Sequence, residues 1–298
     1  MWEQQLKEII SGNIKTLARC ISIIENEAAG YEALLEQLPS SQKPIIGITG
    51  PPGAGKSTLV DALIGSLVSA GKKVAVLCID PSSAFNLGAL LGDRIRMSEW
   101  YDNPNVFIRS LATRGSLGGL HPSIIEITDL IKTAPFDIVI IETVGVGQSE
   151  IEIAGLADCT VVVLVPEAGD EIQTMKAGLM EIADIFAVNK ADRPDADIFV
   201  KNLRLMLAPT FSRHTEEVVV VKTIASQKVG VDELLAHIMQ YLDQKNTPEK
   251  KYWLLAEKAW LLIQKQRMKN IDKSLLKKAI EAEQDFNLYQ FVKRFDNG

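Results

Sequence analysis

Short apolar runs alternate with helix-length segments between residues 45 and about 243. Several runs are continuous β-branched stretches without polar alternation, as expected of strands that are covered on both faces. The candidate strands are Ile45–Thr49, Val74–Ile79, Val106–Arg109, Ile138–Glu142, Thr160–Val165, Ile185–Asn189 and Val218–Thr223. This alternation predicts an α/β fold: a mostly parallel sheet with right-handed crossovers, flanked by helices. Ligands bind such folds at the carboxyl ends of the strands.

A glycine-rich loop follows the first apolar run. Residues Gly50–Ser57 fit the pattern G-x-x-x-x-G-K-[ST], and a helical pattern runs from Lys56 to Ala70. This strand–loop–helix context identifies a P-loop, in which backbone N–H groups point at nucleotide phosphates. Lys56 would reach the β- and γ-phosphates, and the Ser57 hydroxyl would ligate Mg²⁺. The residues predicted to bind nucleotide here are Gly53, Ala54, Gly55, Lys56, Ser57 and Thr58.

A second motif indicates which base the site selects. Residues Asn189–Asp192 follow the sixth apolar run and match N-K-x-D. The Asp192 carboxylate can accept hydrogen bonds from guanine N1–H and the exocyclic amine together, a donor pair that adenine lacks. The motif therefore predicts GTP rather than ATP, with Asn189, Lys190 and Asp192 at the base. Ser226, in the turn after the last run, lies where such proteins contact the guanine oxygen through a backbone amide.

Acidic residues end two further runs. Glu142 closes the fourth run, Asp80 follows the second, and Asp93 lies further along the chain. An acidic residue at a strand end is where P-loop proteins hold Mg²⁺ and its waters. Because Mg²⁺ takes few carboxylates together with waters and phosphates, the three acids cannot all ligate it directly. Ser57 ranks first as a direct ligand, and Glu142, Asp80 and Asp93 compete for direct or water-mediated roles. Capping of the following turn is the alternative role for Asp80.

Helical patterns flank the region of alternating runs. Apolar residues recur at helical spacing over residues 2–38 and 249–296, and proline-containing segments at 39–44 and 247–248 interrupt the chain. The pattern predicts an N-terminal helical extension over residues 1–43, a P-loop GTPase domain over 44–246 and a C-terminal helical arm over 247–298.

Composition excludes several classes of protein. Hydrophobic residues make up 47% of the 298 residues and charged residues 23%, typical of a soluble globular protein. A net charge of −6 does not favour nucleic acid or an anionic membrane as a partner. The chain has no apolar stretch of the roughly 20 residues needed to cross a bilayer, and its first residues lack the features of a secretory signal. Its three cysteines are dispersed. These features predict a cytoplasmic location.

Taken together, these residues resemble the methylmalonyl-CoA-mutase-associated GTPase family, the MeaB-like group that has also been labelled as arginine/ornithine transport-system kinases. The similarity covers nearly the whole chain. It is carried above all by Asp80–Ser83, Leu91–Asp93, Arg114–Gly119 and Glu142–Glu150.

The resemblance implies a homodimeric GTPase of the class that dimerises around nucleotide, with Mg²⁺ and GTP or GDP as its ligands. It also implies that the chain is a chaperone for an adenosylcobalamin-dependent acyl-CoA mutase. Such a chaperone gates delivery of the cofactor and promotes removal of inactivated cofactor, and this chain itself is not expected to bind B12. The C-terminal arm over residues 247–298 is expected to mediate dimerisation.

Residues Pro166–Lys176 match a third switch of the family, one that responds to nucleotide and to the mutase. The resemblance implies a catalytic role for Lys176, whose charge would act like an arginine finger, beside Lys56, Glu142 and Asp93. A solvated helix residue is the alternative for Lys176. Glu167 departs from the family, in which many members carry glycine. Arg114 is a candidate phosphate or partner contact, with a surface ion pair as the alternative.

Other functions compete with this interpretation. A transport-system protein kinase would share the P-loop, although the N-K-x-D motif favours guanine. A metallochaperone GTPase would share the fold, but it would carry a His- or Cys-rich metal loop, and the three histidines and three cysteines here are scattered. A docking module without activity would be expected to have a degraded P-loop, and this P-loop is intact.

Overall fold

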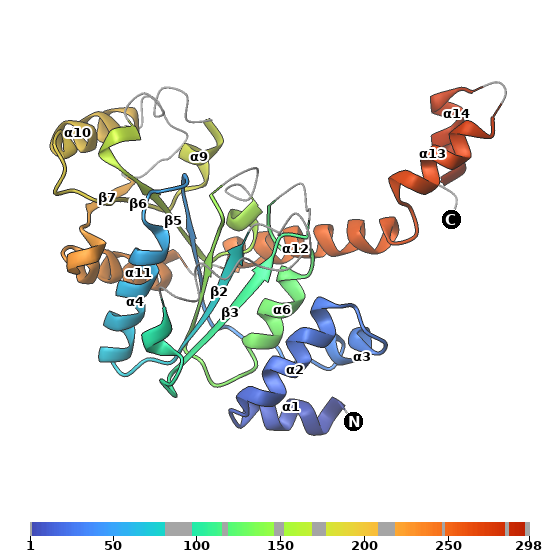
Figure 1. Cartoon of the computed structure of the whole chain (residues 1–298), viewed down its shortest axis with the longest axis horizontal. Helices are drawn as coiled ribbons and strands as arrows, with labels where there is room; N and C mark the ends of the chain where they lie inside the picture. Colours follow the sequence, from blue (N-terminus) through green and yellow to red (C-terminus); the bar gives the residue numbers. More distant parts are fainter. Residues whose placement is uncertain are drawn as a thin grey trace. The chain divides into compact units, whose positions relative to one another are not determined.

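The apolar runs form a seven-stranded sheet in the order β3-β2-β4-β1-β5-β6-β7, and all of its neighbouring strands are parallel (Figure 1). The strands are β1 (Ile45–Thr49), β2 (Val74–Asp80), β3 (Val106–Ala112), β4 (Ile138–Glu142), β5 (Cys159–Leu164), β6 (Ile185–Val188) and β7 (Val219–Lys222). Strands β1, β2, β4, β5 and β6 are buried along their whole length, which explains their continuous apolar sequence. The predicted α/β fold is confirmed.

The computed structural model describes most of the chain. The described residues are 2–80, 97–114, 119–145, 152–168, 177–207, 218–245, 248–283 and 286–295. The chain divides into two compact units, Met1–Lys251 and Tyr252–Gly298. The limits expected at residues 43 and 246 stay predictions.

Helices of the larger unit cover both faces of the sheet (Figure 1). The α-helices among the described residues of this unit are α1 (Trp2–Ile10), α2 (Ile14–Glu25), α3 (Tyr31–Leu35), α4 (Lys56–Ser69), α6 (Ile124–Ile131), α9 (Ala177–Ile182), α10 (Ala196–Leu207) and α11 (Val231–Lys245). Alternate residues of a strand point to opposite faces. On β5, Val161 and Val163 belong to one core cluster with residues of α4 and α11, whereas Val162 and Leu164 belong to a second cluster with residues of α9 and α10.

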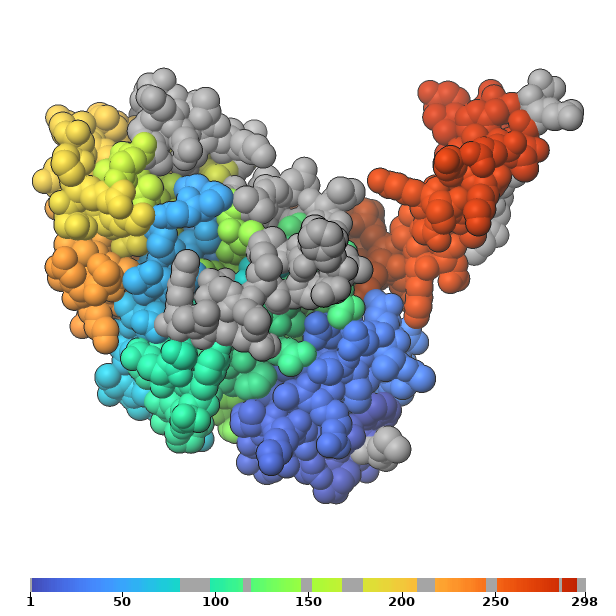
Figure 2. Space-filling model, viewed as in Figure 1, coloured from blue at the N-terminus to red at the C-terminus, as the bar shows by residue number. Residues whose placement is uncertain are grey.

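The end of α2 is linked to β3 and to the residues after it by contacts around Glu25. Helix α2 packs on α6, and the N-terminal helices are drawn in blue in the space-filling view (Figure 2). Glu25, at the end of α2, accepts from Arg109 of β3 at 2.7 Å and from Arg114 at 3.3 Å. Arg114 also donates to the Glu25 backbone carbonyl at 2.7 Å. The ion pair weighed as the alternative for Arg114 is therefore present.

The smaller unit is helical, as its sequence pattern predicts. Helix α12 (Pro248–Met268) leads into it, and α13 (Lys273–Glu281) and α14 (Leu288–Phe295) follow. Asp272 caps α13, because its side chain accepts from the Leu275 N–H at 2.8 Å. Exposed apolar side chains on α12 include Tyr252, Trp253, Leu255, Trp260, Leu261 and Ile263. Nowhere in the described residues is a helix both long enough and apolar enough to cross a membrane.

The ion pairs of Glu25 with Arg109 and Arg114 yield a prediction about the stability of the protein. Glu25→Gln keeps the side-chain shape but removes the charge that faces two guanidinium groups. We expect the free energy of unfolding to fall by about 1–2 kcal/mol, a range discounted for the partial exposure of both arginines. Urea denaturation measures this change. Glu36→Gln, which alters an exposed acid after α3, serves as the control and should change stability by less than about 0.5 kcal/mol. Equal effects of the two variants would contradict the assigned role of Glu25.

Candidate functional site

The glycine-rich loop connects β1 to α4 at the carboxyl edge of the sheet. Gly50 begins the loop with a φ of +137°, a conformation that residues with side chains rarely adopt. A Cβ added at Gly50 would lie 2.1 Å from the Val163 carbonyl oxygen of β5. The loop therefore lies directly against the neighbouring strand, and only glycine fits at its first position.

Lys56 is buried at the start of α4. Its Nζ donates to the carbonyl oxygens of Gly50 at 2.9 Å and of Pro51 at 3.0 Å. Gly145 approaches the same place from the segment after β4, with a φ of +85°. A Cβ added at Gly145 would lie 2.4 Å from both the Gly50 carbonyl oxygen and Lys56 Nζ. The ammonium group is thus held where the glycine-rich loop and the post-β4 segment meet.

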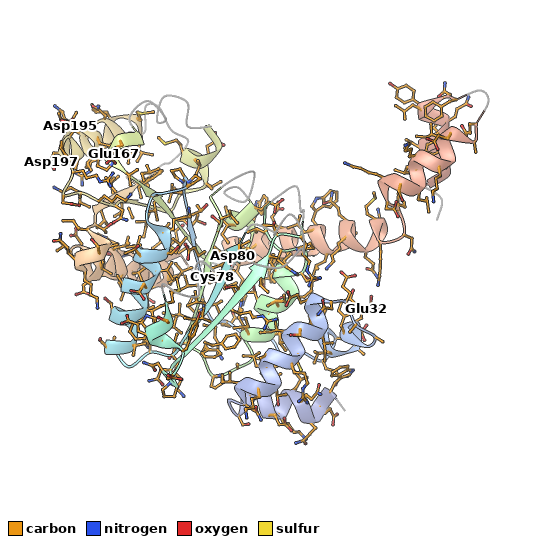
Figure 3. The ribbon with its side chains drawn as sticks, viewed as in Figure 1. Glu32, Cys78, Asp80, Glu167, Asp195 and Asp197 are labelled. Carbon is orange, nitrogen blue, oxygen red and sulfur yellow. The ribbon has the colours of Figure 1, made fainter. Side chains whose placement is uncertain are left out.

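The next residue of α4 contacts one of the predicted acids. Ser57 Oγ donates to Glu142 Oε1 at 2.7 Å, and both side chains are buried. In the sheet register, Glu142 lies beside Ile48 of β1 and Cys78 of β2. Asp80 is two residues further along β2 and is 2% exposed; Figure 3 labels it together with Cys78.

This set of donors fits Mg²⁺. The ion prefers oxygen ligands and needs only one or two protein carboxylates beside waters and phosphates. A hydroxyl and a carboxylate already in contact, with a second buried carboxylate on the neighbouring strand, supply that chemistry. Within the described ranges, these acids are not part of a group of three or more Asp, Glu, His or Cys side chains that could hold a metal ion.

The N-K-x-D turn lies against the glycine-rich loop. Asn189 is buried and donates through Nδ2 to the Ala54 carbonyl oxygen at 2.9 Å. Its Oδ1 accepts from the Ala225 N–H at 3.1 Å, which ties it to the turn after β7. Lys190 has a φ of +56° and donates through Nζ to the Gly53 carbonyl oxygen at 2.8 Å. Asn189 therefore joins the two turns that are predicted to surround the base.

Asp192 and Ser226 are both exposed at these turns. The turns meet through the Ala191 N–H, which donates to the Thr223 carbonyl oxygen at 3.1 Å. Ser226 lies in the short 3₁₀ helix η4 (Ala225–Gln227). An exposed carboxylate beside a buried scaffold is suited to accept hydrogen bonds from an incoming ligand.

The structure brings most predicted site residues to one edge of the sheet. These are the loop and helix start at Gly53–Thr58, the acids Asp80 and Glu142, and the turns that carry Asn189, Lys190, Asp192 and Ser226. The predicted residues Asp93 and Lys176 lie outside the described residues.

Two contacts at this edge had not been predicted. Thr49 Oγ1 and Thr143 Oγ1 lie 2.8 Å apart, and this buried pair links β1 to the segment after β4. Glu167 forms an ion pair with Arg193. Threonine at a strand end is common, so sequence offered no signal for the first contact. For the second, the only signal was that Glu167 stands where glycine is common in the resembled family.

Comparison with known proteins agrees with this geometry. Residues 17–280 match the family model described as methylmalonyl Co-A mutase-associated GTPase MeaB. A putative GTPase of Pyrococcus horikoshii is 40% identical over 287 residues, which cover 94% of this chain and 88% of the relative. The fused isobutyryl-CoA mutase of Geobacillus kaustophilus is 36% identical over 258 residues, 81% of this chain and 24% of that protein. The crystal structure of an LAO/AO transport system kinase superposes with a TM-score of 0.67 at 25% identity, covering 99% of this chain and 96% of that one.

The contact of Gly145 with the glycine-rich loop yields a prediction. Gly145→Ala would place a methyl group against the Gly50 carbonyl and Lys56 Nζ, so the loop must shift. We expect the dissociation constant for GTP to rise about tenfold or more. Isothermal titration calorimetry measures it.

Gly71→Ala is the matched control for Gly145→Ala. Gly71 has a similar φ of +76°, but an added Cβ there meets no atom within 4 Å. It therefore reproduces the backbone strain without the contact. GTP affinity that falls equally in both variants would show that strain, and not the contact with Lys56, explains the loss.

Proposed function

Because the chain belongs to the MeaB family of methylmalonyl-CoA-mutase-associated GTPases, we propose that it is a GTP-hydrolysing chaperone for an adenosylcobalamin-dependent acyl-CoA mutase. In this role it gates loading of adenosylcobalamin and protects or reactivates the mutase. The main support for this proposal is the fused isobutyryl-CoA mutase, because one region of that polypeptide is similar to 81% of this chain. Fusion raises the effective concentration of two modules for each other, which favours modules that act together.

Hydrolysis is assigned to the edge of the sheet described above. Lys56 binds the β- and γ-phosphates. Its ammonium group is held within the glycine-rich loop by hydrogen bonds to the carbonyl oxygens of Gly50 and Pro51. Ser57 and Glu142 hold Mg²⁺, with Asp80 and Asp93 in direct or water-mediated roles. When bound, Mg²⁺ neutralises phosphate charge. Since the Ser57 hydroxyl now donates to Glu142, its lone pairs remain suited to a cation.

Base selection is assigned to Asp192. Its exposed carboxylate accepts from the guanine N1–H and exocyclic amine, while Asn189 and Lys190 brace the turn against the glycine-rich loop. Ser226 lies in the neighbouring turn, where its backbone amide would contact the guanine oxygen. Adenine cannot supply both donors to one carboxylate, so GTP is the substrate.

Partner binding is proposed to accelerate a slow reaction. G proteins without a positioned arginine hydrolyse GTP on the order of 10⁻⁴ to 10⁻³ per second. Lys176 supplies the missing positive charge when the mutase binds, and hydrolysis then changes the affinity of the chain for the mutase. That difference in affinity limits how far the bound nucleotide can shift the equilibrium between free and mutase-bound chain.

The smaller unit is proposed to mediate homodimerisation in the cytoplasm. Helix α12 exposes large apolar side chains, among them Tyr252, Trp253 and Trp260. Such residues are enriched at protein interfaces and are unfavourable when left in water. Their number on one helix is the observation that supports a dimer.

A second candidate function is phosphorylation of a transport-system protein, because the superposed crystal structure is named an LAO/AO transport system kinase. A kinase would transfer the γ-phosphoryl group to a protein acceptor, whereas the chaperone would release it to water.

A GTPase assay with an added mutase tests the proposed function. We expect GTP hydrolysis to rise at least about tenfold when purified, adenosylcobalamin-dependent acyl-CoA mutases are added, because a partner-delivered cation is worth several orders of magnitude in other G proteins. Lys176→Ala should keep the intrinsic rate and lose the stimulation, and Lys56→Ala should lose both.

Labelled nucleotides separate the candidates. With γ-labelled GTP, free phosphate is the expected product, and ATP should be a poor substrate. Transfer of the label to an added protein would support the kinase. An unchanged rate with every acyl-CoA mutase tested would contradict the proposed chaperone function.

A further inference from the structure

The N-K-x-D turn has one well-anchored end. Buried Asn189 is fixed to the glycine-rich loop and to the turn after β7, and Ala191 donates to Thr223. A hydrogen bond of 3.1 Å from the Arg193 N–H to the Lys190 carbonyl oxygen closes the turn. Asp192 lies between the anchored end and Arg193, so the position of its carboxylate depends on both sides of the turn.

The other end of the turn is held by a side chain. Arg193 Nη1 forms an ion pair with Glu167 Oε1, in the 3₁₀ helix η3 (Pro166–Ala168) after β5. The next residue, Pro194, has no backbone N–H and so cannot donate a hydrogen bond that would hold the turn. Asp195 then adopts a φ of +65°, and its carbonyl accepts the Phe199 N–H at the start of α10.

The ion pair bridges the ends of two adjacent strands. Strands β5 and β6 are parallel neighbours, with Leu164 beside Val188 at their carboxyl ends. Glu167 follows the first strand and Arg193 the second. Chiefly because Arg193 donates a hydrogen bond to it, and with a smaller contribution from the charge of Lys190, the pKa of Glu167 lies below its ordinary value. Glu167 is thus ionised at neutral pH and attracts cations on both sides of Asp192.

We propose that Glu167 and Arg193 are positioning residues for guanine binding, and that their ion pair holds the turn that presents Asp192 to the base. This inference rests on the proposed function, because it requires guanine at Asp192. Neither residue needs to touch the nucleotide. Both side chains are about half exposed, with side-chain exposures of 49% for Glu167 and 44% for Arg193, so substitutions are compatible with folding.

The size of the effect follows from the exposure of the pair. Exposed ion pairs change equilibrium constants by factors up to about five. Glu167→Gln should therefore raise the dissociation constant for GTP about two- to fivefold. Glu167→Arg would place a third cation beside Lys190 and Arg193 and should raise the dissociation constant about fivefold or more. Adding Arg193→Glu to Glu167→Arg restores the opposite charges and should recover most of the affinity.

The chain offers a matched control. Asp197 and Lys222 form another exposed ion pair, with Nζ 2.8 Å from Oδ1, which links α10 to β7 without bracing the turn. Glu167 and Asp197 are both labelled in Figure 3. Asp197→Asn removes an ion pair of the same kind and should leave the dissociation constant for GTP unchanged.

Calorimetry on the full chain measures GTP and inorganic triphosphate binding, and steady-state assays give kcat and KM. Positioning of Asp192 predicts that Glu167 variants weaken GTP binding and raise KM, while kcat and the affinity for inorganic triphosphate stay constant. Equal loss of GTP and triphosphate binding would overturn the inference, because the pair would then act on the whole fold. Unchanged GTP affinity in Glu167→Arg would also overturn it.

The wild-type chain separates this inference from the proposed function. If wild type binds GTP no more tightly than inorganic triphosphate, the base is not recognised and both assignments fail. If wild type prefers GTP and Glu167→Arg keeps that preference in full, only the positioning role fails.

Discussion

The contact between the glycine-rich loop and the segment after β4 is the constraint on which the site depends. Ser57 donates to Glu142 at 2.7 Å, and a Cβ added at Gly145 would lie only 2.4 Å from the Gly50 carbonyl oxygen and from Lys56 Nζ. Both contacts are available because β1 and β4 are neighbours in the sheet. A ligand that alters the position of Ser57 or Lys56 therefore also acts on Glu142 at the end of β4 or on the segment after it. Phosphate binding can be coupled to motion elsewhere in this way.

The strand order extends this coupling to the base. Strand β1 lies between β4 and β5, and β6 follows β5, so the glycine-rich loop faces an acid on one side and the N-K-x-D turn on the other. Asn189 links the neighbouring segments, because its buried side chain forms hydrogen bonds with the backbone of both Ala54 and Ala225. In contrast, the outer end of the same turn depends on an exposed ion pair between Arg193 and Glu167. One side of the turn is thus held by buried hydrogen bonds and the other by an exposed ion pair.

Sequence predicted the sheet and the loops because both depend on local chemistry. Continuous β-branched runs identify buried parallel strands. The spacing of the glycines and of Lys56 and Ser57 within Gly50–Ser57 is typical of a phosphate-binding loop between a strand and a helix. The partners of Arg114 and Glu167 could not be predicted, since each pair joins segments distant in sequence and surface charges have many possible partners. The contact of Thr49 with Thr143 was equally hidden, because a hydroxyl pair between adjacent strands has no characteristic spacing.

Nucleotide specificity of Asp192→Asn tests the central claim, that this edge of the sheet binds guanine nucleotides through Asp192. The amide of asparagine can donate to a xanthine oxygen but no longer accepts both guanine donors. Dissociation constants for GDP and xanthosine diphosphate, measured by calorimetry on wild type and variant, are the relevant quantities. We predict that GDP binding weakens about a hundredfold while xanthosine diphosphate binding strengthens. Equally tight GDP binding by the variant would contradict the account.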